Sequence, residues 1–522
     1  MNGGRRGLAS LAPNRISMKR VIALAPVALL LAACAAGPNY RAPPLAAVEV
    51  RNAADPAFVA REPAGSWWHE FGDAELDRLV QRALAANLDL RSALDRVRAA
   101  RAVFVERRLD YAPHAQLDGA YARSDEQIPD FGPQRLDTRS TSLGFDAAWE
   151  LDLFGHVRRS VEAARADLGA EEANLRDVEV TVAAEVARNY FELRGTQRRL
   201  TVARDNLGSA RQSLDLTQLR AEAGRSSDLD VEQSRARLKA VEATIPMLEA
   251  AEKQAGYRLA VLCGERPGAL DPELGAATVA TYARELPIGD ATGLLRQRPD
   301  VRAAERQLAA ATARVGVATA DFFPRVSVSG FVGFLSGDVG HLFGTSAGSD
   351  ARAWAVTPAV SWTAFDLGSV AARVRASRAQ ADGAAANYER AVLVALEDAE
   401  NSFLAYSKRH VQLRSLTAQA AASRHAAELA ELQYREGTAD FLVLLDAQRT
   451  QLEAEDAVAQ SETAVNVAVV AIYKALGGVG QRPHVEPVTA PSVPAAPMPG
   501  PVAMTAEPTA QIHPEPPVGV EP

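Results

Sequence analysis

The sequence of 522 residues has little of what identifies several familiar protein classes. Its only two cysteines, Cys34 and Cys263, exclude a disulfide framework as the source of stability. Acidic residues outnumber basic ones by 65 to 57, which argues against a nucleic-acid partner because phosphate binding needs a basic surface. The eight histidines are scattered, without the spacing of a zinc-binding HExxH motif, and no nucleophile elbow or phosphate-binding loop occurs. We therefore expect neither an enzyme nor a metal site.

No apolar run near the N-terminus is long enough to span a bilayer comfortably as a helix. Instead, Met18-Lys19-Arg20 precedes a short apolar run from Val21 to Leu31, which is typical of an export signal. The run ends in Leu31-Ala32-Ala33-Cys34, which resembles the bacterial lipobox. The resemblance implies a signal peptide over residues 1–33, a diacylglyceryl lipid on Cys34 and, because residue 35 is not Asp, sorting to the outer membrane. A chance cysteine in an ordinary signal peptide is the alternative.

The chain after residue 72 follows one plan twice, at an offset of about 211–214 residues. The corresponding passages, in order, are Tyr111-Ala112-Pro113 with Phe322-Phe323-Pro324, Trp149 with Trp362, Asn189-Tyr190-Phe191 with Asn401-Ser402-Phe403, Ala223-Gly224 with Glu436-Gly437, and Leu262-Cys263-Gly264 with Leu476-Gly477-Gly478. We expect an N-terminal segment over 34–72, structural repeats over 73–290 and 291–478, and a disordered tail over 479–522. The tail is rich in proline and alanine and cannot bury a core.

Each repeat contains two extended stretches, expected at about 115–123, 140–151, 325–334 and 353–365. Apolar and polar residues alternate along them, as where Phe145 and Trp149 share one face and Asp146 the other. Their length suits tilted transmembrane strands, although a soluble hairpin packed on helices would show the same alternation. The loops between paired strands, 125–138 and 336–350, are rich in Gly, Ser and Asp and suit the cell exterior. Four strands cannot close a barrel alone, so a dimer or a trimer would have to pool them.

Proline is absent from residues 157–219 and 369–434, which predicts helices on the order of 95 Å long. Each is expected to return as a second helix, giving helical hairpins over 157–262 and 369–476 with turns at Gly224 and Gly437. Seven-residue repeats mark a coiled-coil seam in each long helix. The seam residues are Val186, Leu193, Leu200, Leu207 and Leu214 in the first helix, and Tyr406, Leu413, Ala420, Ala427 and Tyr434 in the second. A hollow barrel of helices and a solid bundle both remain open.

Several passages resemble the outer-membrane efflux protein family, specifically the NodT-like lipoprotein branch of TolC-type outer membrane factors. They are Trp67 to Leu76, Arg298 to Glu305, Phe322-Phe323-Pro324, Tyr434 to Thr438, Leu444 to Arg449, and Ala475 to Gly478. The resemblance covers about residues 34–480. It implies an α+β membrane protein in which a homotrimer forms a twelve-stranded transmembrane β-barrel continuous with a twelve-helix periplasmic α-barrel. Each protomer would contribute four strands.

The resemblance further implies no catalytic activity, and no cofactor apart from the covalent lipid on Cys34. The protein would lie in the cell outer membrane, extend into the periplasm, and export drugs or other toxic small molecules to the exterior. Its partners would be a periplasmic adaptor and an inner-membrane transporter, typically proton-driven. The alternative within the same fold is the outer-membrane duct of a type I protein secretion system or of a metal-efflux pump.

The resemblance also assigns site residues at the tips of the two hairpins. Asp446 matches an aspartate that faces the pore, while Tyr434 and Asp230 match a hydrogen-bonded pair that keeps the duct closed. Loss of that pair is expected to raise single-channel conductance. The chain departs from the pattern at Val443 and Ala439, where some relatives have a second pore aspartate and a basic latch residue. The expected adaptor-docking residues are Gly224, Arg225, Ser226, Gly437, Thr438 and Ala439.

Overall fold

The computed structural model describes residues 36–43, 50–61, 65–127, 135–277, 281–282, 284–290, 293, 295, 297–337 and 351–478. All of these residues belong to one unit, residues 1–481. The predicted signal peptide, Cys34 and the predicted tail over 479–522 lie outside the described residues.

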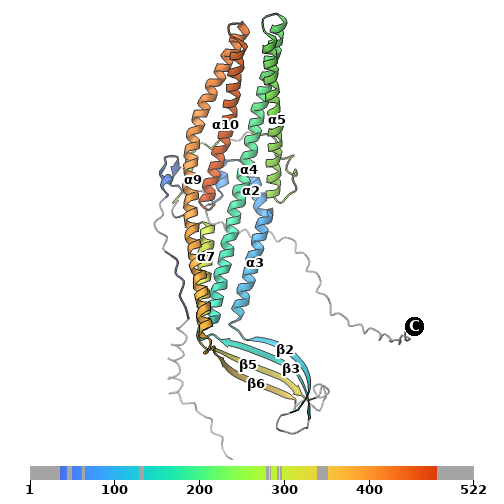
Figure 1. The fold of residues 1–522 in the computed structure, drawn as a ribbon, viewed down its shortest axis with the longest axis vertical. Coiled ribbons are helices and arrows are strands. Elements are labelled where there is room, and N and C mark those ends of the chain that lie inside the picture. The colour runs from blue at the N-terminus through green and yellow to red at the C-terminus, as the bar shows by residue number, and fades with distance from the viewer. Residues whose placement is uncertain are drawn as a thin grey trace, which may run out of the picture. The chain divides into compact units, whose positions relative to one another are not determined.

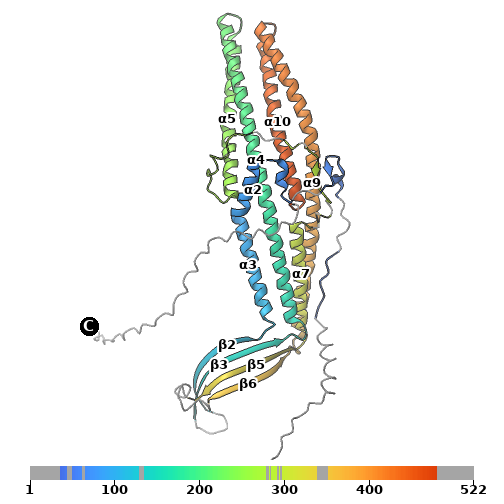
Figure 2. The ribbon, with the colours of Figure 1, turned by 180° about the vertical axis from the view of Figure 1, so that it is seen from behind.

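One antiparallel sheet contains all four predicted strands, in the order β2-β3-β5-β6 (Figures 1 and 2). The strands are β2 (His114–Gln127), β3 (Arg135–Leu151), β5 (Arg325–Ser336) and β6 (Arg352–Ser361). The ladder between β2 and β3 extends into the region expected to be loop, because Arg123 pairs with Asp137 and Arg135 with Asp125 across the strands. The last strand is shorter than expected: it ends at Ser361, and the chain turns at Asp366, whose N–H donates to Thr363.

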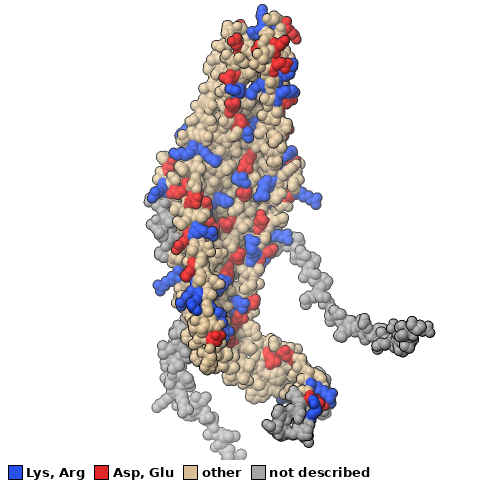
Figure 3. Space-filling model, in the orientation of Figure 1, with Lys and Arg blue, Asp and Glu red and all other residues tan. Residues whose placement is uncertain are grey.

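The sheet has one apolar face, as the alternation predicts. The register aligns Phe145 with Val332 and Val332 with Trp354, so these side chains share a face. Large apolar side chains exposed on this face are Leu117, Tyr121, Phe145, Trp149, Val332, Phe334, Trp354, Val356 and Val360. Figure 3 shows few charged side chains on the visible side of the sheet before its far end. A face this apolar is expected to be covered by lipid or protein.

Two long helical hairpins extend from the sheet (Figure 1). The first pairs α4 (His156–Glu222) with α5 (Asp228–Leu262), and the second pairs α9 (Leu367–Glu436) with α10 (Phe441–Ala475). The seam residues predicted on α4 are all buried, and those on α9 are buried except for half-buried Leu413. Where the chain is described, none of the helices has both the length and the apolarity of a membrane span.

Shorter elements pack around the hairpins. The helix α3 (Leu88–Leu109) packs along α4, and α7 (Pro299–Ala320) lies between α4 and α9. The remaining elements are the 3-10 helices η1 (Arg51–Ala54) and η2 (Trp67–Phe71), the helix α2 (Ala74–Ala86), and the short parallel strands β1 (Phe58–Val59) and β4 (Leu286–Pro287). Together with the middle of the long helices they enclose the main apolar core.

The two halves repeat the same contacts between sheet and helices. The indole Nε1 of Trp149 donates to the carbonyl of Tyr111 at 3.0 Å, and that of Trp362 donates to Phe322 at 3.0 Å. In each half, therefore, a tryptophan at or just beyond the helix-proximal end of a strand holds the end of the preceding short helix. These are the residues that the internal repeat places in equivalent positions.

A second pair of equivalent contacts joins each short helix to the end of a hairpin. Asn87, the N-cap of α3, donates from Nδ2 to the carbonyl of Leu262 at 2.9 Å. Arg298, the N-cap residue of α7, donates from Nη1 to the carbonyl of Ala475 at 3.0 Å. Helix C-termini leave carbonyls without intrahelical partners, so both contacts satisfy groups that would otherwise lack one.

The described residues of the N-terminal segment contact the helices first beside the sheet and then at the middle of α9. The N–H of Ala36 donates to the carbonyl of Phe154, just past β3, and Arg159 holds Asn39 at 2.6 Å. Further along, the carboxylate of Glu400 accepts hydrogen bonds from the backbone N–H groups of Arg51 and Asn52. The first described residue is thus held beside the junction of sheet and helices.

Candidate functional site at the hairpin tips

Each hairpin ends in a tight turn around a glycine with positive φ. Gly224 has φ of 69° and Gly437 has φ of 78°, in the left-handed region that favours glycine. The N–H of Arg225 donates to the carbonyl of Arg220 at 2.7 Å, and the N–H of Thr438 donates to Gln433 at 2.9 Å. These six-to-one bonds are Schellman caps, so the turns close both long helices in the same way.

The predicted docking residues lie on these turns. Gly224, Arg225, Gly437 and Thr438 are exposed, whereas Ser226 and Ala439 are half-buried. Sequence reasoning missed that each tip also presents a pair of exposed leucines at equivalent positions of the repeat. They are Leu219 and Leu229 on the first tip, and Leu432 and Leu442 on the second. Both tips therefore offer small polar turns flanked by apolar side chains, which an incoming helical partner could bury.

Tyr434 is buried where the two hairpins meet, with only 2% of its surface exposed. Its hydroxyl lies 3.4 Å from Ser226 Oγ and 3.4 Å from Thr217 Oγ1, both of the first hairpin. Its ring packs on Phe441 with 5.6 Å between centroids. Tyr434 of the second hairpin thus contacts the first hairpin, and its role in closing the duct stays a prediction.

The partner of Tyr434 differs from the prediction. The carboxylate of Asp230 does not accept directly from the phenol; Ser226 stands between them and donates to Asp230 Oδ2 at 3.0 Å. The reason is local: the same carboxylate oxygen closes a capping box at the start of α5 with Ser227. The hydrogen bond from the Ser227 backbone lowers the pKa of Asp230, which keeps this carboxylate ionised.

Asp446 lies in the first turns of α10 with its side chain exposed. Its carboxylate pairs with Arg449 on the same helix at 2.8 Å. Both side chains are more than half exposed, so the pair is weak and leaves the carboxylate accessible to solvent and ions. The single protomer contains no pore, so the predicted pore position of Asp446 stays a prediction.

Arg220 is a tip residue that sequence reasoning missed. It lies near the end of α4, and its guanidinium donates from Nη1 to the backbone carbonyl of Tyr434. The guanidinium carbon also lies 4.5 Å from the centroid of the Tyr434 ring. Nothing in the sequence distinguishes this arginine from others along α4, because its contact joins residues more than two hundred positions apart.

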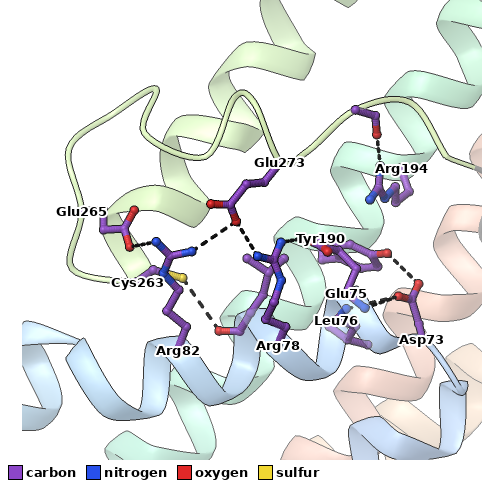
Figure 4. Close-up of polar contacts among 12 residues, drawn as sticks. Asp73, Glu75, Leu76, Arg78, Arg82, Tyr190, Arg194, Cys263, Glu265 and Glu273 are labelled. Atoms are coloured by element: carbon purple, nitrogen blue, oxygen red, sulfur yellow. Dashed lines mark hydrogen bonds and ion pairs between the residues drawn. The ribbon is translucent and has the colours of Figure 1, made fainter.

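Cys263 is the buried C-cap residue of α5. Burial raises the pKa of its thiol to about 11, and Sγ donates to the carbonyl of Leu79 at 3.8 Å. Figure 4 shows its surroundings, where Arg78 and Arg82 of α2 pair with Glu265 and Glu273 in the loop after α5. A protonated, enclosed thiol is a poor nucleophile.

Comparison with known proteins places this fold in a family. A family model described as outer membrane efflux protein matches the chain twice, over residues 79–265 and 292–478. The antibiotic efflux pump outer membrane protein ArpC of Pseudomonas putida is 31% identical over 474 residues, covering 88% of this chain and 96% of the relative. Nodulation protein T of Rhizobium leguminosarum bv. trifolii is 29% identical over 432 residues. The match covers 81% of this chain and 89% of that protein.

A solved structure of the outer-membrane channel OprN matches with a TM-score of 0.82 and 46% identity, over 85% of this chain and 99% of that one. The predicted family is thereby confirmed, together with the predicted outer-membrane location extending into the periplasm. The chain belongs to the outer membrane efflux protein family, whose members are transport components rather than enzymes, and it is the outer-membrane channel component of a tripartite efflux pump.

Proposed function

We propose that three copies of this chain close a twelve-stranded barrel in the outer membrane and a twelve-helix duct in the periplasm. The observation that carries this proposal is the sheet of four strands, whose outer strands β2 and β6 pair on one side only within the described part of the chain. Unpaired backbone groups in hydrocarbon cost several kcal/mol each, so neighbouring copies must supply the missing strands. Three rather than two copies follow from the resemblance to TolC-type factors.

Exposed apolar side chains on the helices support the same assembly. On α9 they are Leu393, Val394, Leu404 and Val411, and on α3 they are Val103, Val105 and Leu109. Side chains of this size on a periplasmic surface would face water in an isolated protomer. Neighbouring copies would cover them, adding roughly 25 cal/mol of stabilisation for each Å² removed from water.

In this assembly Cys34 bears the lipid anchor. What supports the anchor is that Ala36, the first described residue, is hydrogen-bonded to Phe154 beside the end of β3. A short tether from this junction would reach the inner leaflet of the outer membrane. Mass spectrometry of the mature N-terminal peptide should therefore show an acylated Cys34, and a Cys34→Ser variant should lack that mass. An unmodified mature N-terminus in the wild type would contradict the anchor.

At rest, the duct is closed at the tips. Three symmetry-related Asp446 carboxylates would form an acidic ring that attracts cations, although each is partly balanced by Arg449. The contacts of Tyr434 with the first hairpin would hold the second hairpin inward. Reversal potentials in a salt gradient would show preference for cations, and an anion preference would count against the ring.

The cargo that this duct exports is a class of small toxic molecules, among them antibiotics. The proposal is supported by the name of the ArpC relative, an antibiotic efflux pump component that matches nearly end to end. A protein-secretion or metal-efflux role would predict no change in antibiotic tolerance. A deletion strain should therefore become more susceptible to several antibiotics, and the intact gene should restore tolerance. Unchanged susceptibility would reject the drug-efflux role.

The same strain tests whether an adaptor docks at the tips. At Gly224, a Cβ would meet no atom within 4 Å, so a side chain is tolerated sterically within the protomer. Gly224→Asn keeps the positive φ at little strain but adds bulk, whereas Gly224→Ala adds little bulk but strains the backbone by about 1 kcal/mol. If the bare turn is a docking surface, the Asn variant should lose most of the tolerance and the Ala variant little.

The opposite order, with Ala more harmful than Asn, would mean that the glycine serves only as a helix cap. Gly208→Asn is the matched control, because Gly208 also has open space around it but lies on α4 well before the tip. Trimer abundance in the outer membrane must be equal in all variants for the comparison to hold.

A further inference from the structure

Arg220 connects the two hairpins at the tip through a single side chain. It lies on the last turns of α4, in the first hairpin, and reaches the last turn of α9 in the second. Its guanidinium contacts Tyr434 twice, by the hydrogen bond to the carbonyl and by the stacking on the ring. Nη2 also lies near Gly437, 3.7 Å from where a Cβ would be. One planar group therefore covers the end of the opposite helix.

The positive charge of the Arg220 guanidinium lies at the C-terminal end of α9. Among the described residues, this guanidinium contacts the carbonyl and the ring of Tyr434 and pairs with no carboxylate. The C-terminus of a helix carries a partial negative charge from its free carbonyls, so a cation there is stabilised. If α9 moved away, the guanidinium would lose its hydrogen-bond acceptor, its stacking surface and its compensating charge together.

The other contacts of Tyr434 with the first hairpin are weaker. Both involve neutral hydroxyls at 3.4 Å, near the limit for a hydrogen bond. Hydrogen bonds from a charged donor are roughly twice as strong as neutral ones. Further from the tip the hairpins are joined by Gln448 with Ser213 at 2.8 Å and by Arg199 with Asp456 at 2.6 Å. Arg220 is thus the strongest link between the hairpins at the tip itself.

The backbone of Arg220 makes the link sensitive to the turn that carries it. Its carbonyl accepts the Schellman bond from Arg225, while its side chain caps the opposite helix. A partner that pulled on the first turn would therefore shift the guanidinium relative to Tyr434. Gln433, the equivalent residue in the second half, accepts the corresponding backbone bond but carries a neutral side chain.

We propose that Arg220 is the positioning residue of the closed tip: it holds the second hairpin against the first through Tyr434, and the duct opens when its guanidinium leaves that tyrosine. The proposal rests on the gated duct described above. The resemblance implied that Tyr434 and Asp230 alone keep the tip closed, and the proposal adds Arg220 to that role. Asp230 then contributes only indirectly, through its hydrogen bond with Ser226.

Single-channel recording in planar lipid bilayers tests the role of Arg220. Arg220→Gln should raise the ratio of open to closed channels about tenfold, because a charge-assisted hydrogen bond and the stacking are both lost. Arg220→Lys keeps the charge but loses the planar group, so its increase should be smaller. The matched control is Arg435→Gln, one residue from Tyr434, because within the described part of the chain Arg435 pairs only with Glu431 of its own helix. The control should behave as the wild type.

A second measurement separates a latch from a general loss of stability. In a Tyr434→Leu background, Arg220→Gln should add much less to channel opening, since its main partner is already gone. Equal opening in Arg220→Gln and Arg435→Gln, or full additivity with Tyr434→Leu, would overturn the latch while leaving the duct intact. If even the wild-type trimer carried no current under any condition, the proposed duct would fail, and the latch with it. Should Arg220→Gln not assemble, Arg220→Lys against the same control decides the question.

Discussion

Replacing Arg298 with leucine is expected to lower the free energy of unfolding by about 3–5 kcal/mol and to leave little assembled protein in the membrane. All five N–H donors of this guanidinium are used. Nε and Nη2 hold the Asp300 carboxylate at 3.0 and 2.7 Å, and Nη2 also reaches Asp398 at 3.1 Å. Nη1 donates to the backbone carbonyls of Ala395 and Ala475.

These contacts place Arg298 at the junction of three helices. They tie the start of α7 to the middle of α9 and to the end of α10, and only 9% of the Arg298 side chain is exposed. With leucine at this position, the carbonyls of Ala395 and Ala475 and the two carboxylates would lose their donor, and water reaches this junction only in part. Asp300 and Asp398 are exposed enough to regain water, so most of the loss comes from the carbonyls and from the broken junction.

The thermal midpoint of the purified protein in detergent measures this effect. Arg298→Lys keeps the charge but not the forked geometry, and should recover only part of the stability. The matched control is Asn87→Ala at the equivalent junction of the first half, where a neutral cap and one hydrogen bond to Leu262 are lost. That change should cost about 1–2 kcal/mol. A midpoint for Arg298→Leu no lower than that of Asn87→Ala would show that the arginine is not the main tie.

Cysteines placed on the two edge strands are expected to convert the protein into a covalent ring of three chains on oxidation. Leu117 on β2 shares the apolar face of the sheet with Trp354, Val356 and Val360 on β6. Leu117→Cys is combined in turn with cysteine at each β6 position, because the stagger between neighbouring copies depends on barrel closure. At least one combination should yield a trimer on non-reducing gels.

The matched control is Leu117→Cys with Thr357→Cys. Thr357 follows Val356 on the same strand, so its side chain lies on the opposite face and cannot meet that of Leu117. The native thiol of Cys263 is buried, with its pKa raised to about 11, and should not interfere. A cross-linked ring of two chains would favour a dimer, which the number of strands per chain also allows. Absence of cross-linked species in every combination would argue against pairing of β2 with β6.

Local patterns predicted the elements of this fold closely. The period-two alternation in β5 and the seven-residue seam of α4 each involve residues a few positions apart. The register of the sheet confirms the shared face of the first, and burial confirms the second. The glycine turns at 224 and 437 were also predicted, because positive φ is a property of single residues. The strands β2 and β3 were predicted too short, since cross-strand ion pairs extend a ladder beyond what propensity suggests.

By itself, the sequence determined the duplicated plan, the four strands with one apolar face, the two long hairpins and the family. These follow from periodicity and from motifs whose order survives along the chain. Only the tertiary structure decided which groups meet at the tip: Ser226 rather than Asp230 beside the Tyr434 hydroxyl, and Arg220 across the end of α9. Such contacts join residues over two hundred positions apart, and a rotation of one helix by a fraction of a turn would change every partner.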